Sequence, residues 1–375
     1  MDQMTRRDAV RIIASTGALL YSGCVVGPKH KTLQDYGGVA ALVPLPGGVQ
    51  PWPTRDPFLF CVHHQDNYPA GNSDFGPQAS LAGREIGRDF AGIDGWRMYH
   101  GHKVPGFPSH PHRGFETVTV VREGLLDHAD SMGAAARYGQ GDVQWLTAGS
   151  GIQHSEMFPL LHRDRSNPFE LFQIWLNLPA KDKFAAPHFS MLWNETIPRL
   201  KLVDEKGKLS EITLISGAYG EARPPQPPAN SWAAKAENEV AIWSLRLEAG
   251  ATVILPAVHA ETSRSLYFFA GQTIAIADKT CAAGHRLDMA DGRPIFIQNA
   301  SAPAQLLLLA GRPIKEPVVK HGPFVMNKGN EIQDAIRDYR QSHFGGWPWP
   351  SHGPVHGPRA ERFARFADGR VIKPS

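Results

Sequence analysis

The sequence predicts an all-β protein built from two antiparallel β-barrels, followed by one short C-terminal helix. Three observations support this prediction. Glycine (37 residues) and proline (31 residues) are abundant among the 375 residues, which is typical of a chain with many turns. Short β-branched and aromatic segments recur in two blocks, at about 110–178 and 199–315. Only the segment near 330–343 has apolar residues at convincing helical spacing.

The composition excludes several classes of protein. The net charge of +3 provides no strong basic field, so we expect no nucleic-acid partner. Three cysteines, Cys24, Cys61 and Cys281, cannot form a disulfide framework. The unusual feature is the content of 17 histidines, because histidine is the side chain that most often binds metals.

Residues 1–26 have the pattern of an export signal. Arg6 and Arg7 come before an apolar run at 12–21, which is followed by small residues and then by Cys24. The start of the chain resembles a twin-arginine signal. The run is too short to span a bilayer. The residues up to Cys24 also resemble a lipoprotein cleavage box, which predicts a lipid anchor there. We therefore expect an exported protein, periplasmic or anchored on the outer side of the inner membrane; the alternative is an ordinary amphipathic N-terminal helix.

The first β-rich unit is expected at 55–190, after a Pro- and Gly-rich region at 27–56 that should contain a linker and an entry strand. Residues 63–95 are polar and contain several glycines, so we expect a long loop. The expected strands are apolar or β-branched segments bounded by turn residues. They lie at 58–62, 116–121, 143–146 and 170–178.

The second β-rich unit is expected at 191–325, and residues 326–375 should form a helix and an extended tail. Gly250, Gly271 and Gly311 separate short apolar strands in this unit, as in a sandwich or barrel. Asn330 is the expected helix cap. The apolar face of the helix comprises Ile332, Ala335, Ile336 and Tyr339.

Two pairs of residues with metal-binding side chains lie on the predicted strands of the first unit. His110 and His112 are two residues apart, and His154 and Glu156 repeat this spacing. Side chains at i and i+2 of a strand point to the same face. Two adjacent strands would thus surround one point with three imidazoles and a carboxylate. Metal binding requires neutral imidazoles, so occupancy should fall below about pH 6.

Spacing alone leaves the carboxylate ligand open between Glu116 and Glu156. Glu116 lies four residues after His112, on the same face if the strand continues regularly. A nitrogen and oxygen donor set without thiolate suits Fe²⁺, Mn²⁺, Ni²⁺ or Co²⁺ and tolerates Zn²⁺. His259 and Glu261 form another His-x-Glu pair, but no H-x-H precedes it, so we expect no second metal site.

The strings HPHRGFETVTVV and GDVQWLTAGSGIQHSEM, at 110–121 and 141–157, resemble the signature of the pirin family of iron-binding bicupins. The resemblance continues at 169–187 and 311–346. It implies a bicupin fold of two jelly-roll barrels, with His110, His112, His154 and Glu156 as metal ligands and iron as the metal. Glu116 would then be a nearby group that orients an imidazole. The export signal, the longer 63–105 region and the tail after 346 depart from the family pattern.

The pirin resemblance implies two kinds of function. Some pirins cleave flavonols such as quercetin with O2, so one expectation is a metal-dependent dioxygenase acting on flavonols, related enols or catechols. Glu156 would then also act as the base that takes the substrate proton. The other expectation is a non-enzymatic iron-dependent redox sensor or ligand-binding protein. A Zn²⁺ hydrolase or isomerase would use the same ligands.

Overall fold

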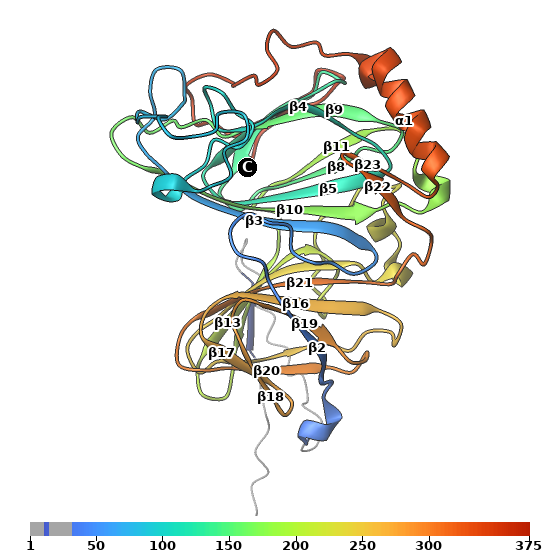
Figure 1. Ribbon diagram of the computed structural model, residues 1–375. Helices are drawn as coiled ribbons and strands as arrows, with labels where there is room; N and C mark the ends of the chain where they lie inside the picture. Colours follow the sequence, from blue (N-terminus) through green and yellow to red (C-terminus); the bar gives the residue numbers. More distant parts are fainter. Residues whose placement is uncertain (1–10, 15–31) are drawn as a thin grey trace, which may run out of the picture.

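The computed structural model describes residues 11–14 and 32–375, and it is almost entirely β-structure. Figure 1 shows two stacked β-units, with the single α-helix on the outside of the upper one. The prediction of an all-β chain with one short C-terminal helix is confirmed. No helix of the described residues is long and apolar enough to cross a membrane. The expected export signal at 1–26 falls outside the described residues except for 11–14.

The upper unit consists of two facing antiparallel sheets. The first has the order β11-β8-β5-β10-β3 and the second the order β25-β24-β7-β6-β9-β4. The strands of the first sheet are β3 (Phe58–Tyr68), β5 (Phe115–Glu123), β8 (Val143–Thr147), β10 (Asn167–Asn177) and β11 (His188–Leu192). The strands of the second sheet are β4 (Gly106–His112), β6 (Leu125–Asp130), β7 (Ala135–Gly139), β9 (Ile152–Met157), β24 (Phe363–Arg365) and β25 (Val371–Ile372).

The lower unit also has two sheets. Their orders are β1-β12-β13-β14-β21-β16-β19-β2 and β15-β20-β17-β18. The larger sheet comprises β1 (Arg11–Ala14), β2 (Val39–Pro44), β12 (Arg199–Val203), β13 (Leu209–Ser216), β14 (Ala241–Leu247), β16 (Ser263–Ala270), β19 (His285–Met289) and β21 (Ala304–Gly311). The smaller comprises β15 (Thr252–Leu255), β17 (Thr273–Ile276), β18 (Lys279–Ala282) and β20 (Ile295–Asn299).

The two units share a buried core at their contact. A single apolar cluster contains Phe172 and Ile174 of β10 together with Tyr267 of β16 and Leu307 of β21. Trp52 stacks on Tyr267 with 5.5 Å between the ring centroids. Because apolar side chains from both units exclude water together, the contact stabilises the two units as one body.

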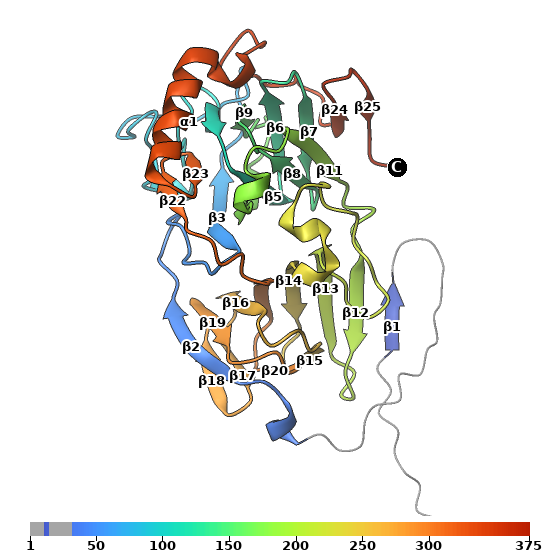
Figure 2. The same cartoon turned by 90° about the vertical axis from the view of Figure 1, so that its right-hand side faces the viewer.

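Two segments near the N-terminus form strands whose pairing the sequence pattern does not predict. Residues 39–44 lie within the region 27–56, where a linker and an entry strand are expected, and they form β2, which pairs with β19 of the lower unit (Figure 2). Residues 63–68, expected in a loop, continue β3, which pairs with β10 along its whole length. Sequence polarity is misleading in β3 because polar side chains such as His64 and Asp66 are buried there.

The C-terminal region folds back onto the upper unit. Strands β22 (Val319–His321) and β23 (Phe324–Met326) precede helix α1 (Gly329–Ser342). Lys328 rather than Asn330 is the residue before the helix, and Glu331 accepts hydrogen bonds from the backbone N–H groups of Asn327 and Lys328. The tail after residue 346 is expected to be extended. Part of it forms β24, which pairs with the edge of β7.

Candidate metal centre

Three histidines of the upper unit come together where β4 pairs with β9. His110 lies directly opposite His154 in the antiparallel register, so the two side chains share one face of the sheet. His112 lies two residues further along β4, on the same face. One ligand atom of each histidine lies within 4.8 Å of the others.

The free ring nitrogens of this triad suit a metal ion. Nδ1 of His110 donates to the carbonyl oxygen of Pro108 at 2.9 Å, which leaves its Nε2 unprotonated. Nδ1 of His112 and both ring nitrogens of His154 are buried without a hydrogen-bond partner. Buried polar atoms nearly always have partners, and a divalent ion would supply a partner for one nitrogen of each ring.

Burial also prepares the imidazoles for metal binding. Desolvation lowers the pKa of His110 to about 4 and holds the pKa values of His112 and His154 well below the usual value. The three rings are therefore neutral near pH 7, which is the form that binds metals. Aromatic neighbours fix the orientation of His112, whose ring lies edge-on to Phe115 and Trp175.

Glu156 lies beside the triad, but its carboxylate is held by residues of the facing sheet. The Gln173 side-chain amide donates to Oε2 at 2.7 Å, and the Thr119 hydroxyl lies 3.0 Å from Oε1. Burial raises the pKa of Glu156 to about 7. Glu156 is not among the three side chains within 4.8 Å of one another, so its carboxylate would have to turn to join them.

Glu116 belongs to a different part of the molecule, contrary to the expectation that it orients an imidazole. Its carboxylate accepts hydrogen bonds from the hydroxyls of Thr147, at 2.7 Å, and Ser231, at 2.5 Å. The regular strand assumed from the sequence ends at His112, and β5 begins in the other sheet. Gly114, with φ of +87°, lies in this turn. Glu116 thus links the two β-units instead of facing the histidines.

Sequence analysis did not identify two further groups around the triad. His128 of β6 lies 5.6 Å from His154 between ring centroids, and its Nε2 is 3.2 Å from Asp130. Gln173 of β10 holds Glu156. These residues come from strands adjacent only in the folded sheets, so sequence spacing carries no signal for them. The pair His259 and Glu261 lies elsewhere, where Glu261 forms ion pairs with Arg312 and Lys315.

Comparison with known proteins assigns the family. The Pirin profile matches residues 49–176, and the Pirin C-terminal cupin domain matches residues 242–345. A Pseudomonas aeruginosa protein named "Putative quercetin 2,3-dioxygenase" is 37% identical over 239 residues, covering 64% of this chain and 79% of that protein. Human pirin is 32% identical over 271 residues, covering 70% and 87%. The chain belongs to the pirin family.

The fold of this pirin is that of solved bicupins. The crystal structure of quercetin 2,3-dioxygenase from Acinetobacter baumannii superposes with a TM-score of 0.62 at 24% sequence identity, covering 83% of this chain and 96% of that one. At this identity the similarity concerns the fold. The pirin resemblance and the bicupin fold inferred from the sequence are therefore confirmed.

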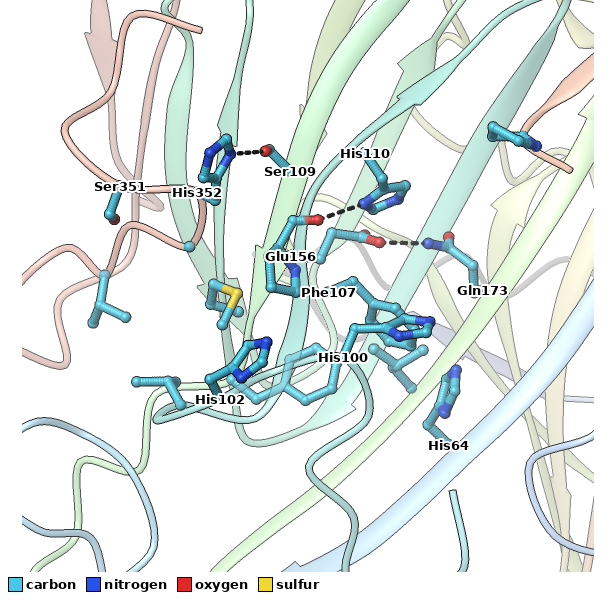
Figure 3. A pocket seen from close by; sticks show the side chains of 18 of the residues that line it. His64, His100, His102, Phe107, Ser109, His110, Glu156, Gln173, Ser351 and His352 are labelled. Carbon is cyan, nitrogen blue, oxygen red and sulfur yellow. Dashed lines mark hydrogen bonds between the residues drawn. The ribbon is translucent and has the colours of Figure 1, made fainter. Parts of the chain in front are cut away.

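A cavity of about 1080 Å³ opens beside the triad of this pirin (Figure 3). Aromatic and aliphatic side chains dominate its interior, as in sites that bind small organic molecules. The 69–105 loop adds His100, His102 and Lys103 to its wall, and the tail adds His352, which hydrogen-bonds Ser109 at 2.6 Å. The 69–105 loop and the C-terminal tail thus both help to shape the cavity.

Proposed function

We propose that this pirin is an iron-dependent dioxygenase that opens flavonols or related enols and catechols with O2. The observation that supports the proposal most is the set of three histidines with free ring nitrogens beside a large, aromatic-lined cavity. The names of the Pseudomonas and Acinetobacter proteins point to the same reaction class.

His110, His112 and His154 would hold the metal, with Glu156 as the fourth ligand. A bound ferrous ion would supply Lewis acidity and the one-electron chemistry that O2 requires. The cavity adjoins His110 and His112. A metal ion held there would therefore be accessible to a substrate that enters the cavity.

Glu156 is suited to move a proton. Its pKa of about 7 lies near physiological pH, where a general base works most effectively. It borders the cavity, and it would take the proton of an acidic enol or phenol hydroxyl. Gln173 and Thr119 would then hold the carboxylate in the position from which it exchanges that proton.

The apolar walls would hold the rings of the substrate and exclude water. Phe60 and Trp175 stack with 4.7 Å between ring centroids, and both line the cavity. A planar aromatic ligand gains both area burial and ring contacts on such a surface.

The test is O2 uptake by protein reconstituted anaerobically with Fe²⁺, using quercetin as substrate and ¹⁸O2 to follow both oxygen atoms. We expect flavonol-dependent uptake with both atoms in the products, and none with the His112→Ala variant. His285→Ala, on β19 of the lower unit, is the matched control. If the protein binds quercetin without O2 uptake, the proposed dioxygenase activity is refuted, and a ligand-binding function is favoured.

A further inference from the structure

His64 belongs to a buried chain of hydrogen bonds at the other end of the same cavity. The Tyr99 hydroxyl lies 2.6 Å from Oδ2 of Asp66 and 2.9 Å from Nδ1 of His64, and Arg97 forms an ion pair with Asp66 at 2.9 Å. The side chains of Asp66 and Tyr99 are buried, and His64 is 5% exposed.

The direction of these hydrogen bonds determines the tautomer of His64. The Tyr99 hydroxyl has one proton, and Asp66, paired with Arg97, is the acceptor at 2.6 Å. Tyr99 must therefore accept from Nδ1 of His64, so Nδ1 carries the ring proton and Nε2 has the free lone pair. Burial lowers the pKa of His64 to about 3, so the ring is neutral near pH 7.

Tyr99, in the 69–105 loop, has an unusual backbone conformation. Tyr99 has φ of +56°, a left-handed conformation that costs free energy for a residue other than glycine. Backbone hydrogen bonds in both directions with Asp89 fix it there. Strain of this kind is commonly kept where a side chain must have a particular position.

Nε2 of His64 has no hydrogen-bond partner among residues 32–375, and His64 lines the cavity (Figure 3). His64 comes from β3, in the sheet that faces the histidine triad across the cavity. Nε2 is not among the fully buried unpaired atoms, so it is open to the cavity, where a ligand N–H or O–H can donate to it in place of water.

The strand register gives the separation, along β3 and β10, between His64 and the part of the cavity wall that contacts His112. His64 lies opposite Leu171, and Phe60 lies opposite Trp175, which contacts His112. Four residues along a strand span about 13 Å. A ligand that reaches both ends of the cavity therefore has the length of two to three aromatic rings.

We infer that His64 is a specificity-determining residue whose Nε2 accepts a hydrogen bond from a ring hydroxyl of the substrate, at the end of the molecule remote from the metal-binding histidines. Tyr99 is the positioning residue that keeps this nitrogen unprotonated. The substrate class is thereby narrowed to multi-ring aromatics with a phenolic hydroxyl at the distal end. This inference rests on the proposed function for the substrate class, but its hydrogen-bonding premise can be tested without turnover.

The first measurement is the tautomer of His64 in metal-free protein, by long-range ¹H–¹⁵N NMR with ¹⁵N-labelled histidine. We expect a pyridine-type Nε2 and a protonated Nδ1 in the wild type, and loss of this preference in Tyr99→Phe. The opposite tautomer in the wild type would overturn the inference.

The second measurement compares binding of galangin and kaempferol, which differ by one hydroxyl on the pendant ring, by quenching of intrinsic tryptophan fluorescence in metal-free protein; Trp175 lines the cavity. We expect kaempferol to bind about tenfold more tightly, the order of effect of one hydrogen bond to a neutral group. The preference should disappear in His64→Phe and fall in Tyr99→Phe, while His285→Phe keeps it.

An unchanged preference in His64→Phe would overturn the assignment of His64, and so would equal binding of the two flavonols by the wild type. If neither flavonol binds, the flavonol part of the proposed function fails. The role of His64 is then tested with 2-naphthol and 2-methylnaphthalene. We expect the wild type to prefer 2-naphthol and His64→Phe to lose this preference; an unchanged preference in His64→Phe would overturn the assignment.

Discussion

The pH dependence of metal affinity tests whether Glu156 is a ligand. Its pKa of about 7 in the metal-free protein means that protons compete with the metal below pH 7. The affinity should fall about tenfold per pH unit there, or about 100-fold between pH 8 and pH 5. This corresponds to about 2.7 kcal/mol at 1.36 kcal/mol per unit. The histidines add little to this dependence, because the pKa of His110 is about 4 and those of His112 and His154 are also lowered.

Glu156→Gln removes the titrating group, so the affinity of this variant should be lower than that of the wild type at pH 8 and nearly constant down to pH 5, and the difference between the two proteins should shrink as the pH falls below 7. Competition between a chelator and the protein for Co²⁺, measured at four pH values, gives these affinities. Glu237→Gln, at an exposed position, is the control. A wild-type affinity that does not change between pH 8 and pH 5 would show that the three histidines bind the metal without Glu156.

The remaining predictions concern the ligands, the stability and the export of the protein. His112→Ala should lose stoichiometric metal in elemental analysis yet keep the wild-type circular dichroism spectrum, because the core is large; retained metal would contradict the ligand set. The pKa of Glu116 is raised from 4.5 to about 7 by burial, so its charge opposes folding above pH 7 and not below pH 4.5. Glu116→Gln should therefore raise the free energy of unfolding in urea by up to about 3 kcal/mol at pH 8 and change it little at pH 4.5; equal effects would refute this account. Arg137→Ala should lower the free energy of unfolding by about 3–5 kcal/mol, because Asp127 loses its buried partner at 2.7 Å. Thermal unfolding measures this loss, and a much smaller loss would refute the account. We also propose that the protein is exported with cleavage near residue 23, and an intact N-terminus found in a cytoplasmic fraction by mass spectrometry would exclude it.

The predicted loss of metal near pH 6 illustrates the limit of sequence reasoning about the site. The sequence identifies histidines, whose ordinary pKa suggests that pH range. Burial in the folded protein lowers the pKa values of the histidines and raises that of Glu156. Since solvation depends on every neighbour of a group, the midpoint moves to about 7 for a site that includes Glu156.

The sequence by itself determined the strand patterns, the single helix and the i, i+2 spacing that places His110 with His112 and His154 with Glu156 on common faces. These features are local, since the side-chain period of a strand is set by the backbone. Only the tertiary structure decided that β2 joins the lower unit, that Glu116 lies in the sheet opposite the histidines, and that Tyr99 of a long loop meets His64. The pairing and register of strands depend on contacts between residues far apart in the chain, and local pattern carries no information about which distant partner a strand will find.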